Sequence, residues 1–169
     1  MALRPLREPD FAPFARAFAD DPTLHLRVGR VKPHTERSIA DETAAEGGAR
    51  QRGAWARFAI ARARDDALGG ALLIHDVSWQ HRRAEVGLWV APDGRGSGAG
   101  TRALGLACRL VFGHLGFDRL QLYTEASNRP MRALAARAGF REEGLLRAYE
   151  REHDGGRSDI VLAARLASD

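Results

Sequence analysis

The sequence contains one cysteine, one lysine and no run of 18 apolar residues. A lone cysteine cannot close an internal disulfide, so this chain is not a disulfide-stapled scaffold. The lack of a long apolar run argues against a transmembrane helix, and we expect no membrane partner. The opening residues, MALRPLREPDF, lack the apolar core of a secretory signal, which leads us to expect a cytoplasmic protein.

Metal-ligand patterns and blocks of like charge are lacking as well. The six histidines are scattered without the paired spacing of zinc sites, so we expect no metal. A net charge of +4 and a pI near 10.1 would suit nucleic-acid binding, but acidic residues are interleaved with the arginines throughout. We therefore expect no nucleic-acid partner, and the excess positive charge instead suits a polyanionic ligand.

The pattern of apolar residues predicts one α/β (α+β) domain over residues 1–169. With 44% apolar residues the chain is long enough for a full core, and we see no linker or repeat. A mixed, mostly antiparallel sheet of about seven strands is expected, flanked by helices, with one parallel strand–helix–strand crossover. Periodicity and turn signals predict strands at 3–7, 55–63, 67–76, 84–90, 119–124, 141–149 and 158–166, and helices at 10–18, 35–45, 101–115 and 129–138.

A glycine-rich turn, RGSGAG at residues 95–100, lies between a predicted strand and a predicted helix. Glycines allow a tight turn and a close approach of the backbone to a ligand. The first N–H groups of the following helix lack intrahelical partners, and the helix dipole adds positive charge there. Such a turn is suited to phosphate, and it differs from a P-loop because no G-K-[ST] occurs. We therefore predict a pyrophosphate-bearing ligand.

Two classes of enzyme use such a turn. Residues 94–99 also fit G-x-G-x-x-A, which is typical of dinucleotide-binding enzymes, with Glu125 then available as the ribose acid. Against that interpretation, the turn follows three strands of a meander and not the first strand of a doubly wound sheet. The dinucleotide-binding enzyme is therefore kept as the weaker alternative.

Taken together, the motifs resemble the GNAT superfamily of acetyl-CoA-dependent N-acetyltransferases, and within it the RimJ/RimL-like group. The resemblance spans nearly the whole chain, and the order and spacing of its motifs are more specific than any one of them. The similar segments are LRPLREPD, AEVGLWVAPDGRGSGAG, Asn128 followed by RAGF, REEGLLR and RSDIVLAARL.

The resemblance implies a set of residues that bind acetyl-CoA, the acyl donor. Backbone amides of the turn would hold the pyrophosphate, and the backbone of Leu88 and Val90 would pair with the pantetheine arm. An amide near Val90 would stabilise the oxyanion. Asn128 is either a helix cap or a partner of the pantetheine, and both roles are compatible. The expected cofactor-binding residues are Leu88, Val90, Arg95, Gly96, Gly98, Ala99, Gly100 and Asn128.

Acetyl transfer also needs a base for the amine and a proton for the leaving thiolate. Glu85 is the expected base, directly or through water, with Glu125 as the second choice. Relatives keep a tyrosine or a serine as the acid at two positions that are Ala135 and Met131 here. Ser127 or water is left as the proton donor.

The resemblance implies attack by a primary amine on acetyl-CoA within a ternary complex. The acceptor would be a small amine or a protein N-terminus, and a homodimer is compatible with this type of protein. Because the usual hydroxyl donors are missing, a non-catalytic acyl-CoA-binding sensor of the same fold is a further alternative.

Overall fold

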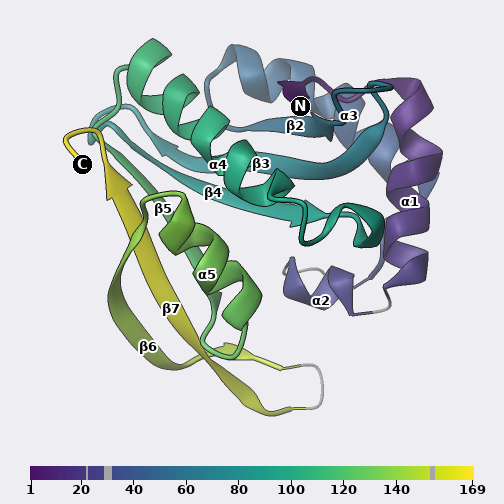
Figure 1. The fold of residues 1–169 in the computed structure, drawn as a ribbon. Coiled ribbons are helices and arrows are strands. Elements are labelled where there is room, and N and C mark those ends of the chain that lie inside the picture. The colour runs from purple at the N-terminus through teal and green to yellow at the C-terminus, as the bar shows by residue number, and fades with distance from the viewer. Residues whose placement is uncertain (22, 29–31, 153–154) are drawn as a thin grey trace.

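The computed structural model describes residues 1–21, 23–28, 32–152 and 155–169. It contains a seven-stranded sheet with the strand order β1-β2-β3-β4-β5-β7-β6 (Figure 1). Every neighbouring pair is antiparallel except β4–β5, which is parallel, so the predicted fold class is confirmed. The strands are β1 (Ala2–Arg4), β2 (Ala56–Ala61), β3 (Leu68–Ser78), β4 (Arg83–Val90), β5 (Arg119–Glu125), β6 (Arg141–Arg151) and β7 (Arg157–Leu166).

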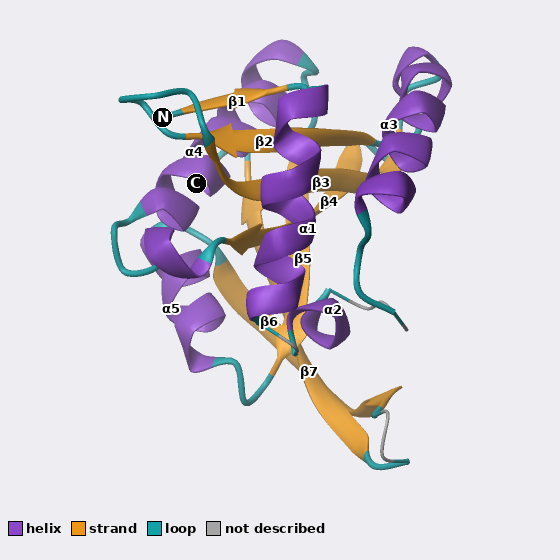
Figure 2. Cartoon of the chain, turned by 90° about the vertical axis from the view of Figure 1, so that its right-hand side faces the viewer, coloured by secondary structure: helices purple, strands orange, loops and turns teal. Residues whose placement is uncertain are grey.

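Helices cover both faces of the sheet. Figure 2 shows α1 and α3 on one side and α4 and α5 on the other. The helices are α1 (Phe11–Asp20), α2 (Leu24–Arg27), α3 (Glu36–Gln51), α4 (Ala99–Cys108) and α5 (Arg129–Arg137), with 3-10 turns at Glu8–Asp10 and Pro92–Gly94 and a π-helical turn at Arg109–His114. No helix among the described residues is long and apolar enough to cross a membrane.

The side-chain alternation of the strands feeds two cores. Leu72, Val86 and Leu120 point to the α4/α5 face and pack with Leu104 and Val111. Residues on the opposite face pack under α1 and α3, and this second core is strongly aromatic. Its largest members are Phe14, Phe18, Ile39 and Trp89.

The central feature of the sheet is a parting between β4 and β5. Along β4, pairing with β3 runs from Arg83 to Val90. Pairing with β5 comprises only Arg83–Arg119, Ala84–Leu120 and Glu85–Gln121, although both strands continue. Beyond Glu85 and Gln121 the two strands diverge (Figure 1), and we call the region between them the split.

Helix α5 ends as its sequence predicts. Asn128 caps the helix by accepting a hydrogen bond from the N–H of Met131 (3.2 Å). At the other end, the N–H of Phe140 donates to the carbonyl of Ala135 (3.0 Å), and Gly139 has φ of 87°. This is a Schellman ending, and glycine adopts the positive φ that it requires without strain.

The predicted end of the second helix at residue 45 was wrong. Helix α3 continues through Gly47 and Gly48 to Gln51. The side chain of Glu46 accepts a hydrogen bond from the N–H of Arg57 on β2 (3.0 Å) and also binds Arg50. These contacts hold the last turns of the helix against the sheet, so tertiary contacts override the low helix propensity of glycine.

Aspartate is a favoured cap residue, so the sequence predicts that Asp10 caps the helix at 10–18, and this prediction was also wrong. Its carboxylate accepts hydrogen bonds from the Arg4 guanidinium (2.6 Å) and from the N–H of Arg7 (2.8 Å), and it makes no side-chain cap to α1. Asp10 is buried, and a buried carboxylate requires paired donors. The acid therefore anchors the strand β1 to the start of α1.

Candidate active site

The backbone of Leu88 and Val90 points into the split. The N–H of Ala91 donates to the carbonyl of Gly69 on β3 (2.9 Å). The Trp89 carbonyl also faces β3, because a Cβ on Gly70 would stand 2.3 Å from that oxygen. Backbone groups of successive residues in a strand point to opposite edges. The N–H and C=O groups of Leu88 and Val90 therefore point away from β3, where a ligand can reach them.

The glycine-rich turn lies at the open end of the split, since it joins β4 to α4. Gly96 and Gly98 have φ of 75° and 77°, a region that glycine occupies without strain. Gly98 precedes the first residue of α4, Ala99, and its carbonyl accepts the N–H of Arg102 (3.1 Å). The first N–H groups of α4 are thus available to an anion at the carboxyl end of β4.

Gly100 has a different environment from the other glycines of the turn. It is buried, and a Cβ placed on it would stand 2.3 Å from Cδ1 of Leu134 on α5. Its missing side chain therefore permits the close packing of α4 against α5. The N–H of Gly100 belongs to the first turn of α4. Its contact with phosphate stays a prediction.

Arg95 is engaged with two partners. Its Nε donates to the carbonyl of Val90 (3.1 Å), and its Nη2 donates to Asp21 at the end of α1 (2.8 Å). The hydrogen bond from Arg95 is the largest of the effects that lower the pKa of Asp21. The side chain of Arg95 thus connects the glycine-rich turn with the end of β4 and with Asp21, which directly follows α1.

Glu85 lies where the pairing of β4 with β5 ends. Its carboxylate is 3.6 Å from Nε2 of His75, its register partner on β3. Burial raises the pKa of Glu85, the negative charge of Asp76 adds to this, and a hydrogen bond with Gln121 opposes it. Arg83, a partner considered from the sequence, instead binds Asp76 (2.7 Å). The negative charge of the Glu85 carboxylate, which lies beside the split, is therefore only weakly balanced by positive charge.

Sequence reasoning missed three residues on the same face as Glu85. His75 is its neighbour on β3, and burial lowers the pKa of this histidine. On β5, Nε2 of Gln121 donates to the hydroxyl of Tyr123 (3.4 Å). Alternation along the strands was available as a signal for these residues, but it identifies neighbours only once the register between strands is known.

Glu125, Ser127 and Asn128 gather at the far end of β5. The hydroxyl of Ser127 donates to the Glu125 carboxylate (3.1 Å). Gln121, the register partner of Glu85, is four residues before Glu125, which corresponds to about 13 Å along the strand. The structure thus brings Ser127 together with Glu125 and leaves Glu85 in a separate group.

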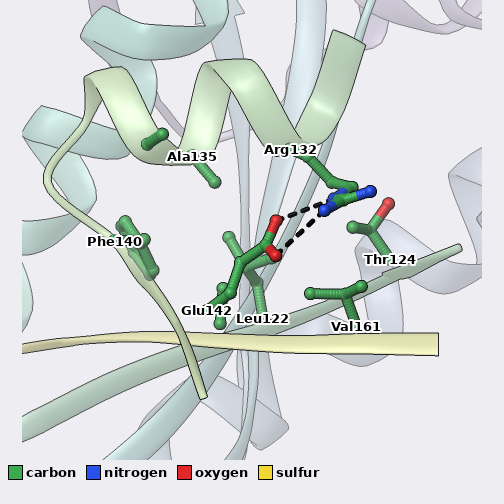
Figure 3. Close-up of a pocket in the computed structure, with 9 residues that line it drawn as sticks. Leu122, Thr124, Arg132, Ala135, Phe140, Glu142 and Val161 are labelled. Atoms are coloured by element: carbon green, nitrogen blue, oxygen red, sulfur yellow. Dashed lines mark hydrogen bonds and ion pairs between the residues drawn. The ribbon is translucent and has the colours of Figure 1, made fainter. Parts of the chain in front are cut away.

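A small cavity of about 20 Å³ lies between α5 and the strands β5 and β7 (Figure 3). It is mostly apolar, and Arg132 and Glu142 close one side with two hydrogen bonds of 2.7 and 3.0 Å. That volume admits about one water molecule, so this cavity is not a cofactor site. Ala135, which lines it, is only 2% exposed, so that position faces the core.

No set of three or more histidine, cysteine or acidic side chains among the described residues is arranged to hold a metal ion. The single cysteine, Cys108, is buried on α4, and burial raises the pKa of its thiol. A thiol in that state is a poor nucleophile.

A mostly antiparallel sheet with one parallel strand–helix–strand crossover defines the fold class of the chain. The profile of the family described as acetyltransferase (GNAT) domain matches residues 1–141, so the chain belongs to this family. A similar solved structure is RimJ from Mycobacterium smegmatis in complex with CoA-disulfide, at 31% identity and a TM-score of 0.84. That match covers 98% of this chain and 81% of RimJ. The predicted resemblance to the RimJ/RimL-like group is confirmed.

Two further matches are to proteins named as N-acetyltransferases. The putative ribosomal N-acetyltransferase YdaF of Bacillus subtilis (strain 168) is 32% identical over 83 residues, which cover 49% of this chain and 45% of YdaF. The chain thus spans about half the length of the curated relatives that it matches. Spermidine N-acetyltransferase from Vibrio cholerae, solved with CoA and spermine, is 21% identical with a TM-score of 0.84, covering 99% of this chain and 95% of that one, and shows likeness of fold alone.

Proposed function

We propose that the protein is an acetyl-CoA-dependent N-acetyltransferase that acts on a primary amine. The observation that carries this proposal is the split, with the backbone groups of Leu88 and Val90 that point away from β3 on one side and the glycine-rich turn at its end. A strand edge suits the amides of pantetheine, and first-turn N–H groups suit pyrophosphate. Acetyl-CoA carries both groups in one molecule.

In this proposal the amine attacks the thioester directly, within a ternary complex. Backbone amides near Val90 face the developing oxyanion, and the amide nitrogen of Asn128 faces the pantetheine or the thiol end. Glu85 is the proposed base, and it lies five residues, about 16 Å, before Val90 along β4, so the proton of the ammonium must reach it through several intervening groups or water molecules. The leaving thiolate takes its proton from the attacking amine or from water, with Ser127 as a weaker donor because its hydroxyl is given to Glu125.

The acceptor that we propose first is a protein N-terminal amine. Two of the relatives bear on this choice, since RimJ is 31% identical over most of both chains and YdaF is named as a ribosomal N-acetyltransferase. An α-amino group has a pKa near 7.7–8.0, so a moderate base suffices to deprotonate it. A polyamine is the second candidate, and a small amine of another kind is compatible with the same site.

Release of CoA thiol from acetyl-CoA tests this function. We expect turnover with a peptide that begins with a free alanine and none with the same peptide blocked by N-acetylation. Spermidine serves as the competing acceptor in the same assay. Binding of acetyl-CoA without turnover on any amine would instead identify a sensor, and preferential binding of NAD would favour a dinucleotide-binding enzyme.

The variant Glu85→Gln tests the base. We expect turnover at neutral pH to fall about 10²-fold, the usual contribution of a general base. Acetyl-CoA affinity should be unchanged, since Glu85 lies away from the turn, and higher pH should partly restore the rate because more of the amine is then neutral. Wild-type turnover in this variant would move the role to Glu125 or to water.

A further inference from the structure

His75 extends further along the split than Glu85. The two residues are register partners on β3 and β4, with 3.6 Å between Nε2 and the carboxylate. The same Nε2 is 3.9 Å from the point where a Cβ on Gly87 would stand. Gly87 is two residues beyond the last β4 residue that pairs with β5, on the same face as Glu85. The imidazole is therefore directed toward the diverging strands.

Gly87 leaves room for this arrangement. A Cβ atom at position 87 would have Nε2 of His75 as its one neighbour within 4 Å outside the adjoining residues. The backbone of Gly87 has no positive φ that would require glycine. The missing side chain thus opens space above β4 at the start of the split. His75 borders that space and is 35% exposed, whereas the side chain of Glu85 is 18% exposed.

We propose that His75 is the residue that takes the proton from the attacking ammonium, with Glu85, whose carboxylate is 3.6 Å from the same Nε2, as the counter-ion of the imidazolium that forms. This inference rests on the proposed acetyl transfer and deepens it. Along β4, Gly87 lies two residues, or about 7 Å, beyond Glu85. The imidazole covers that part of the distance between Glu85 and Val90, and water bridges the remainder.

The surroundings keep His75 in the state that can accept a proton. Burial lowers its pKa, and the negative charge of Asp76 opposes that effect. A neutral imidazole is therefore the main form near pH 7. The charged and titratable groups on the strands around His75 are few. Its own strand contributes Asp76, β4 contributes Glu85 and Arg83, and β5 contributes Tyr123. On β2, Arg57 is the register partner of Leu73.

The proton balance of the step is complete. Nε2 of His75 accepts one proton from the ammonium, which frees the nitrogen lone pair. A carbon–nitrogen bond forms at the acetyl carbonyl, the carbon–sulfur bond breaks, and a second proton from the amine ends on the CoA thiolate. The imidazolium then returns its proton to solvent, so the products are an amide, CoA thiol and one proton.

The test is the pH dependence of kcat/KM for the peptide with a free N-terminal alanine, measured for the wild type, His75→Gln, Glu85→Gln and the double variant. The acid limb reports the ionisation of the base in the free enzyme. We expect His75→Gln to lose about 10²-fold at pH 7 and to move the acid limb, because the carboxylate of Glu85 is then the base that titrates. The double variant should be little worse than the single ones, as for residues that act as a unit.

His81→Gln is the matched control, since His81 is exposed in the turn after β3. It should leave rate and profile unchanged, and the KM for acetyl-CoA should stay constant in all variants. A wild-type profile in His75→Gln overturns the proposal. A uniform loss of rate with the acid limb unmoved also overturns it, because that is the effect of a structural role.

An NMR titration of the His75 ring supplies a readout that does not depend on activity. We expect its pKa to lie below the ordinary histidine value of about 6.5 and to fall further in Glu85→Gln, since a negative charge at 3.6 Å is removed. An unchanged histidine pKa in Glu85→Gln contradicts the pairing. A wild-type protein that binds acetyl-CoA yet acetylates no amine rejects the proposed function, whereas an active wild type with an equally active His75→Gln rejects the histidine alone.

Discussion

Arg95 shows how one residue can link two parts of the proposed site. From the sequence it is expected to contact phosphate, and in the structure it binds Asp21 and the Val90 carbonyl. Both partners would compete with a pyrophosphate for the same guanidinium. Acetyl-CoA binding would then break the contact of Arg95 with Asp21 and so release the end of α1.

The pair of variants Asp21→Asn and Arg95→Ala tests this competition. We expect Asp21→Asn to bind acetyl-CoA about two- to fivefold more tightly, because a partly exposed ion pair of modest strength no longer holds the arginine. Arg95→Ala should bind about tenfold or more weakly, as expected for loss of a charged hydrogen bond. Isothermal titration calorimetry measures both constants.

Asp93→Asn is the control for Asp21→Asn, since it removes the same charge from an exposed ion pair, with Arg62 (3.0 Å), just before the turn. Equal tightening in both variants would point to general electrostatics. Weaker binding in Asp21→Asn would mean that the pair positions Arg95 for the phosphate.

Among the elements, the turn between β4 and α4 has the clearest test. Gly98→Val forces a branched residue to adopt a φ of 77°, which distorts the turn. We expect acetyl-CoA binding to weaken at least tenfold while the far-UV circular dichroism is retained. Gly105→Val, inside α4 with no atom within 4 Å of its Cβ position, is the matched control and should bind normally.

Gly100→Val behaves differently in this scheme, because its side chain would collide with Leu134 and push α5 away from α4. We expect this variant to lose thermal stability with or without ligand. Normal acetyl-CoA binding by Gly98→Val would show that the turn does not hold the phosphates.

At the level of elements, the sequence predicts strands better than helix ends. Alternation of apolar residues was enough for β3 and β4, and the Asn128 cap and Gly139 located α5 correctly. The end of α3 could not be predicted, because Glu46 binds a strand that is distant in sequence from the helix start. His75 was missed for a related reason: its contact with Glu85 depends on the β3–β4 register, which local patterns do not reveal.

At the scale of the molecule, the sheet consists of two parts joined by a narrow seam. One part contains β1 to β4 and the other contains β5, β7 and β6, and three residue pairs connect them. The proposed acetyl-CoA site touches both parts, through Leu88 and Val90 on one side and Asn128 on the other. A ligand that bridges two parts stabilises only the native state.

Thermal unfolding measures that effect. At 100 times its dissociation constant, a ligand specific for the native state adds about 2.7 kcal/mol. For a chain of this size we expect a rise in Tm of about 5–10 °C with acetyl-CoA. NAD and ATP at equal concentration should shift Tm much less. No shift with CoA species, or a larger shift with NAD, would contradict the assignment of the ligand.

The one-sided pairing of β4 has a consequence for hydrogen–deuterium exchange. The amide protons that point to β3 are held in the sheet ladder, whereas those of Leu88 and Val90 point into the split. In the free protein, exchange should therefore alternate between slow and fast at successive residues beyond the pairing with β5, from Gly87 to Ala91. Acetyl-CoA should slow the fast positions selectively, so that the strand becomes uniformly protected. Uniform slow exchange without ligand would mean that the edge of β4 is closed in solution.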